Sequence, residues 1–66
     1  MPIKVRTNET RAEEARVAVS TLRLPHEEME ANIIDLITNL LHLAHQEGLD
    51  PQAILRMAET HFEEEK

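Results

Sequence analysis

Apolar and polar residues recur with helical periodicity through the middle of the chain. Between residues 25 and 46, apolar side chains repeat at intervals of three and four, and polar side chains follow the same repeat on the opposite face. The pattern predicts one long helix over about residues 25–47. Its apolar face contains Met29, Ile33, Leu36, Ile37, Leu40, Leu41, Leu43 and Ala44, and its polar face contains Glu28, Asn32, Asp35, Asn39, His42 and Gln46.

The apolar face of this helix is wider than one packing partner requires. Projected at 100° per residue it covers roughly half of the circumference, whereas a helix packed on one neighbour needs a stripe of about 100°. A single short helix therefore leaves part of the face uncovered. We expect the N-terminal segment or a second chain to cover the remainder.

A turn signal follows this helix directly. Gly48 can adopt the left-handed conformation that ends a helix, Asp50 is a good N-cap, and Pro51 suits the first position of a new helix. We predict a second helix over residues 51–64, packed against the first as an antiparallel hairpin, and a solvated, fraying end over the glutamates 63–65. The apolar positions of the second helix are Ile54, Met57, Ala58 and Phe62.

The N-terminal third carries a weaker helical signal. Thr10 and Glu13 have the spacing of a capping box, which predicts a helix over about residues 9–22 with a thin apolar stripe of Ala12, Ala15, Val19 and Leu22. Residues 1–8 alternate apolar and basic side chains, as a short strand or a disordered arm would. The predicted organisation is an arm over 1–8, one helical domain over 9–64 and a tail over 65–66.

The length of the chain bears on how this domain is completed. A protein of 66 residues buries only roughly 60% of its unfolded surface, and this one contains no cysteine for disulfide bonds. We therefore predict an all-α fold completed as a homodimer, in a four-helix arrangement. The predicted core and interface residues are Met29, Ile33, Leu36, Ile37, Leu40, Leu41, Leu43, Ile54, Met57 and Phe62.

The net charge of −6 is unevenly distributed. Residues 1–23 carry five basic and three acidic groups, whereas residues 24–66 carry two basic and ten acidic groups. The single aromatic residue disfavours a platform for stacking nucleic-acid bases. With no cysteine, no signal peptide and no apolar span, the sequence predicts a cytoplasmic protein that does not enter a membrane.

Candidate chemistry is sparse. Glu28 and Asp35 lie two turns apart on one helix and could contribute to a magnesium site, although a solvated acidic stripe explains them more simply. His42 and His45 have the spacing of a zinc-binding pair but lack further ligands. His61 falls within the apolar arc of the last helix, where we expect a half-buried histidine with a hydrogen-bond partner. No nucleophile or phosphate-binding loop is recognisable, so no catalytic residue is assigned.

The helix at 35–44 and the sequence Gly48-Leu49-Asp50-Pro51-Gln52-Ala53-Ile54-Leu55 resemble the C-terminal part of MazG-type proteins, which are all-α nucleoside triphosphate pyrophosphohydrolases. In that family a similar turn leads into a short helix that ends near a phenylalanine, here Phe62. The resemblance covers residues 32–62 and implies a magnesium site formed by E-x-x-E and E-x-x-D motifs. Asp35 matches the last position of the second motif, but Asn32 replaces its glutamate, and the first motif is not reproduced.

A third possibility rests on the basic arm. A strand over residues 3–7 followed by two helices is similar in order to a ribbon-helix-helix DNA-binding dimer, in which Lys4 and Arg6 would read bases. Leu24 and Pro25 replace the glycine expected between its helices, and the acidic remainder of the chain repels phosphates. The sequence thus favours a non-enzymatic homo-oligomeric assembly module that needs no cofactor and could also bind another protein. The alternatives are a magnesium-dependent pyrophosphohydrolase using Glu28 and Asp35 with Glu13 or Glu14, and a DNA-binding dimer.

Overall fold

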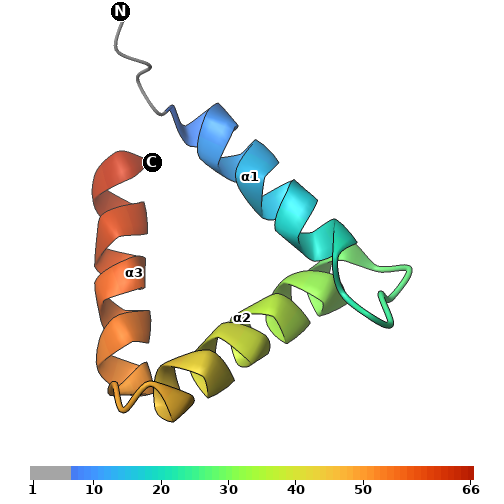
Figure 1. Ribbon diagram of the computed structural model, residues 1–66. Coiled ribbons are helices and arrows are strands. Elements are labelled where there is room, and N and C mark those ends of the chain that lie inside the picture. Colours follow the sequence, from blue (N-terminus) through green and yellow to red (C-terminus); the bar gives the residue numbers. More distant parts are fainter. Residues whose placement is uncertain (1–6) are drawn as a thin grey trace, which may run out of the picture.

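The computed structural model describes residues 7–66, which form three α-helices and no strand. The helices are α1 (Asn8–Ser20), α2 (Met29–Gln46) and α3 (Pro51–Glu65). They lie along the three sides of an open triangle, with α2 joining the other two (Figure 1). The expected all-α fold is confirmed for these residues. Most of the expected arm, including Lys4 and Arg6, lies outside the described residues.

Helix α1 begins one turn earlier than a capping box at Thr10 would place it. Thr7 is the N-cap, and its hydroxyl accepts a hydrogen bond from the Thr10 backbone N–H at 3.1 Å. The Thr7 carbonyl accepts the first helical bond from the Arg11 N–H at 2.9 Å. The predicted helix over about residues 9–22 is confirmed within two residues at each end, but Thr7 and not Thr10 is its cap, because a threonine three residues earlier provides the same capping bond.

Helix α2 begins at Met29, four residues later than predicted. Glu28 is its N-cap residue and has an extended backbone, with φ −88° and ψ 128°. The backbone of His26 is engaged in hydrogen bonds with the Asn32 side chain, which hold this stretch outside the helix. Residues 21–28 therefore form the connection between α1 and α2, and the helix start predicted near Pro25 is wrong.

The turn between α2 and α3 has the predicted construction. Gly48 has a φ of 75°, and its N–H donates to the His45 carbonyl at 3.1 Å while the Leu49 N–H donates to the Ala44 carbonyl at 2.9 Å. The Asp50 carboxylate caps α3 by accepting from the Gln52 and Ala53 N–H groups at 3.0 and 3.3 Å, and Pro51 is the first helical residue. However, α2 and α3 diverge from this turn (Figure 1), so packing along their lengths as an antiparallel hairpin is not confirmed.

The third corner of the triangle is closed by polar side chains. Arg11 of α1 forms an ion pair with the Glu65 carboxylate, and the Asn8 side-chain amide donates to the Glu65 carbonyl. The end of α3 was expected to be a solvated, fraying tail, but the helix continues through Glu65 and this residue is half-buried against α1. The expectation is wrong for Glu65, because α1 supplies an oppositely charged partner at this position.

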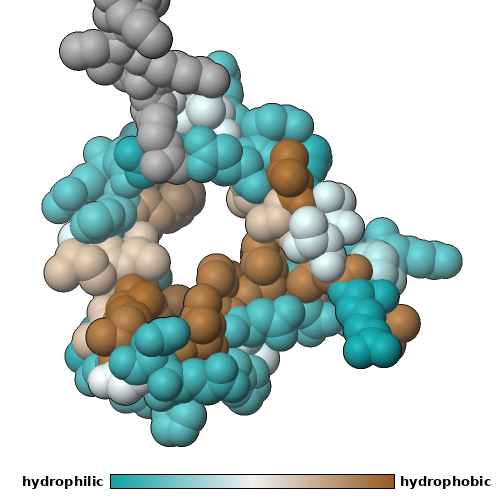
Figure 2. Space-filling model, viewed as in Figure 1, coloured by the Kyte–Doolittle hydropathy of each residue, from teal (hydrophilic) through white to brown (hydrophobic). Residues whose placement is uncertain are grey.

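Few side chains are buried in this arrangement. Among residues 7–66 the buried side chains are those of Val19, Ala44 and Asn32, and none of the large side chains is fully buried. In the single chain, the ten residues predicted as core and interface do not form a core. In Figure 2, hydrophobic residues gather along α2 and at its corner with α3, around an opening that passes through the molecule.

Candidate interaction surface

The largest feature of the described chain is an exposed apolar surface on α2 and α3. Its eight residues each expose between 39% and 62% of their area, whereas Leu36 and Leu41 of α2 are half-buried. Within each helix, periodicity places these side chains on one face, because residues at intervals of three and four share a face. The exposed apolar surface consists of Met29, Ile33, Ile37, Leu40, Leu43, Ile54, Met57 and Phe62.

The size of this surface is comparable to a protein–protein interface. Taking about 190 Å² per residue, within the roughly 150–250 Å² that aromatic side chains bury, these partial exposures correspond to about 750 Å² per chain. A standard interface buries about 800 Å² on each partner. Exposed apolar patches of this size are found at protein-binding, membrane-binding and ligand-binding sites and at sites of aggregation.

Helix α1 leaves the surface open because its own facing side chains are small. A groove of about 210 Å³ separates α1 from α2, with Ala12, Ala15 and Val19 on one side and Met29 and Ile33 on the other. The two alanines are too short to fill the space between the helix axes. Helix α1 therefore contacts α2 near their shared corner, where Val19 is buried.

A second groove lies between α1 and α3 and has a volume of about 500 Å³. Ala12 and Ala58 line it from the two helices, together with Phe62, and polar residues including Arg11 and Lys66 lie around it. His61 also lines this groove and is exposed, so the expectation of a half-buried histidine is wrong. The reason is again that α1 presents alanine where a larger side chain would have covered its neighbours.

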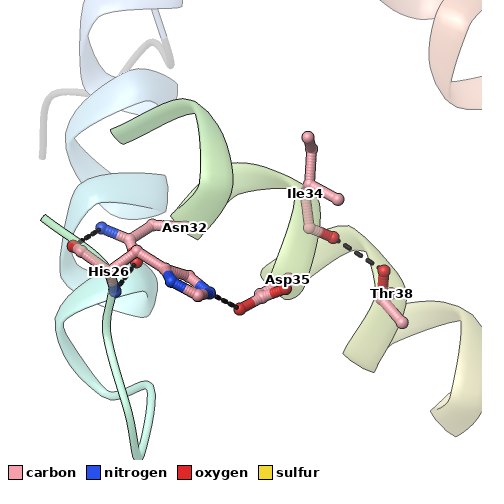
Figure 3. Close-up of polar contacts among 5 residues, drawn as sticks. All are labelled: His26, Asn32, Ile34, Asp35 and Thr38. Carbon is pink, nitrogen blue, oxygen red and sulfur yellow. Dashed lines mark hydrogen bonds and ion pairs between the residues drawn. The ribbon is translucent and has the colours of Figure 1, made fainter. Parts of the chain in front are cut away.

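The loop before α2 is held by a cluster that we call the His26 clasp (Figure 3). The Asn32 side chain accepts a hydrogen bond from the His26 backbone N–H at 2.6 Å and donates to the His26 carbonyl at 2.8 Å. The His26 ring contacts the Asp35 carboxylate through Nε2 at 2.8 Å. Asn32 is 6% exposed, so its amide satisfies both polar groups of one peptide residue away from bulk water.

Sequence reasoning missed this role of Asn32, which was assigned to the outward polar face of the helix. The available signal was weak: an asparagine one turn inside a helix, where its propensity is poor, following a loop with proline. His26 was interpreted as a surface residue. Its side chain is 53% exposed, as expected, yet it bonds to Asp35 and its backbone is held by Asn32.

The acidic residues considered for a metal site do not form a metal-binding group within residues 7–66. Glu28 is the N-cap residue of α2 and makes no side-chain capping bond, and Asp35 contacts His26. Glu13 pairs with Arg16 of its own helix at 3.5 Å. Within residues 7–66 there is no group of three or more histidine, aspartate or glutamate side chains arranged to hold a metal ion.

Two further observations concern membrane spans and similarity to known proteins. Along the part of the chain that the structure describes, no helix combines the length and apolar character needed to cross a membrane. Comparison with known protein families, with curated proteins and with solved structures finds no match. The resemblance to MazG-type proteins therefore stays a prediction from the residues that carry it.

Proposed function

We propose that this protein is a non-enzymatic assembly module that functions as a homodimer, in which the exposed apolar surface of each chain packs against the other. The observation that carries the proposal is the exposure of these eight large apolar side chains, while among residues 7–66 only Val19, Ala44 and Asn32 are buried. Burying about 750 Å² per chain at roughly 25 cal/mol per Å² would contribute a gross stabilisation on the order of 35–40 kcal/mol for two chains. This gross figure is then largely offset by the entropy of association and of side-chain ordering.

The small number of buried side chains among residues 7–66 supports the proposal of a partner chain. Domains of about 60 residues are marginal even when compactly folded, and this one leaves its main apolar helix face open. Disulfide bonds are excluded because the chain contains no cysteine. Oligomerisation is one of the general means by which so small a domain gains a core.

The proposal is tested by measuring solution mass by light scattering across nanomolar to micromolar concentration. We expect the wild-type protein to be a dimer at micromolar concentration. Leu40→Glu places a charge within the exposed apolar surface and should weaken association at least about 100-fold, since burying an unpaired charge is costly. Asn39→Glu adds the same charge at the neighbouring, polar position and should leave the mass unchanged.

Two results would contradict the proposal. A wild-type monomer that unfolds cooperatively at micromolar concentration would show that the chain needs no second copy. Release of pyrophosphate from a nucleoside triphosphate in the presence of Mg²⁺, lost in Asp35→Asn, would replace the non-enzymatic assignment by the hydrolase alternative.

A further inference from the structure

The charge distribution along α2 carries an inference about how two copies meet, which rests on the proposed homodimer. The glutamates at positions 27, 28 and 30 lie at the start of α2, whereas His42, His45 and Glu47 lie at its end. Between these ends Asp35 is the one charged residue, and it contacts His26. The middle of the helix is thus apolar on one face, with acid concentrated at one end.

This asymmetry distinguishes the two possible directions of packing. In a parallel pair of α2 helices, the three glutamates of one copy would lie beside the three of the other, and like charges at close range repel. In an antiparallel pair, they would lie beside the two histidines and the single glutamate of the opposite end. The helix dipoles also favour the antiparallel pair, because the positive end of each helix then lies beside the negative end of the other.

Two copies that pack in this way are related by a twofold axis. A twofold axis places the same patch of both chains in contact, and a residue on the axis meets its own copy. Helix α2 spans Met29–Gln46, so Ile37 lies at its middle, with Met29 and Ile33 before it and Leu40 and Leu43 after it. We propose that α2 packs antiparallel against α2 of a second copy, with the twofold axis close to Ile37.

The absence of cysteine from the chain allows a direct test by disulfide crosslinking. Under mild oxidation, Ile37→Cys should form a covalent dimer, because its two copies meet at the axis. Met29→Cys should not, since each copy of residue 29 lies eight residues, or about 12 Å, from the axis, which places the two copies about 24 Å apart along the helices. A disulfide requires Cα atoms within about 7 Å. Thr38→Cys is the matched control, because residue 38 lies at nearly the same position along the helix axis but on another face. It should also remain uncrosslinked.

A second measurement keeps the test independent of any disturbance caused by Ile37→Cys. A spin label at Gln46→Cys lies on the exposed end of α2, away from the apolar surface. Antiparallel packing with the axis near Ile37 places the two labelled positions about 27 Å apart along the helix direction, whereas parallel packing places them side by side. The label-to-label distance in the dimer therefore reports the direction of packing.

The outcomes separate this inference from the proposed function. A dimer in which Met29→Cys crosslinks as well as Ile37→Cys, with short distances between labels at position 46, is parallel and overturns the inference alone. A dimer in which neither position crosslinks has its interface elsewhere. This result overturns the packing inference but is still consistent with homodimer formation. A wild-type protein that is monomeric at all concentrations overturns both the inference and the proposed homodimer. The apolar surface would then be a candidate binding site for a different protein.

Discussion

The two corners at the ends of α2 make similar changes of direction by different means. The α2–α3 corner is built from consecutive residues: a left-handed glycine, two backbone bonds that close α2 and an aspartate cap that opens α3. The α1–α2 corner uses an eight-residue connection, 21–28, that is anchored by a side chain from inside the following helix. One corner is formed by local backbone geometry, and the other depends on a single amide.

This difference indicates how each corner should respond to substitution. At the α2–α3 corner several small contributions act together, so no single residue carries most of the stability. At the α1–α2 corner Asn32 makes both of the hydrogen bonds that hold His26, and its replacement removes them at once. We expect the less regular corner to be the more sensitive one.

The largest effect is expected for Asn32→Ala. It removes two hydrogen bonds and leaves the His26 backbone groups partly buried without partners, which should lower the free energy of unfolding by about 2 kcal/mol. Asn39→Ala is the matched control, because Asn39 is exposed and alanine is a better helix former. Thermal unfolding at equal chain concentration measures both, and equal melting temperatures for the two variants would contradict the role of the clasp.

An intermediate effect is expected for Gly48→Ala at the other corner. The space around Gly48 is open, with nothing within 4 Å of an added Cβ, so the cost comes only from its φ of 75°. A left-handed alanine costs about 1–2 kcal/mol, and asparagine, which tolerates this conformation, should cost less. Chemical denaturation of Gly48→Ala and Gly48→Asn tests this order. The conformational explanation fails if asparagine destabilises the protein as much as alanine does.

The smallest effect is expected for Asp35→Ala, which removes the carboxylate beside His26. The two side chains are about half exposed, at 53% and 47%, so the pair should contribute roughly 0–1 kcal/mol and less at high salt. Unfolding in low and high salt measures the contribution. A loss as large as that of Asn32→Ala would show that the carboxylate, and not the amide, maintains the corner.

The contrast between the corners also explains what could be predicted from the sequence. Gly48, Asp50 and Pro51 act on their immediate neighbours, so their spacing alone indicated the end of one helix and the start of the next. Asn32 acts on a residue six positions away in a non-helical stretch, and its polar character alone indicated only an outward-facing position. The start of α2 was misplaced for the same reason, because a tertiary contact overrides the local helical pattern.

The exposed apolar surface was predicted in part. The width of the apolar face indicated that one helix could not cover it, and the structure leaves it open on α2 and α3. The geometry around it depends on Ala12 and Ala58, whose small side chains leave grooves between α1 and its neighbours. Periodicity marks such alanines as apolar, but it does not reveal how far apart the helices will lie.

The near absence of a core has a consequence for how the amount of this protein is controlled. If the second copy completes the fold, the folded fraction rises with concentration, because binding stabilises only the native chain. Chains made in small numbers would spend more time open and would be removed by proteases, which act on the unfolded state. Pulse-chase measurements should then show a longer half-life at higher expression, and the Leu40→Glu variant should lose that dependence. The open triangle would thus link the lifetime of each chain to the supply of its partners.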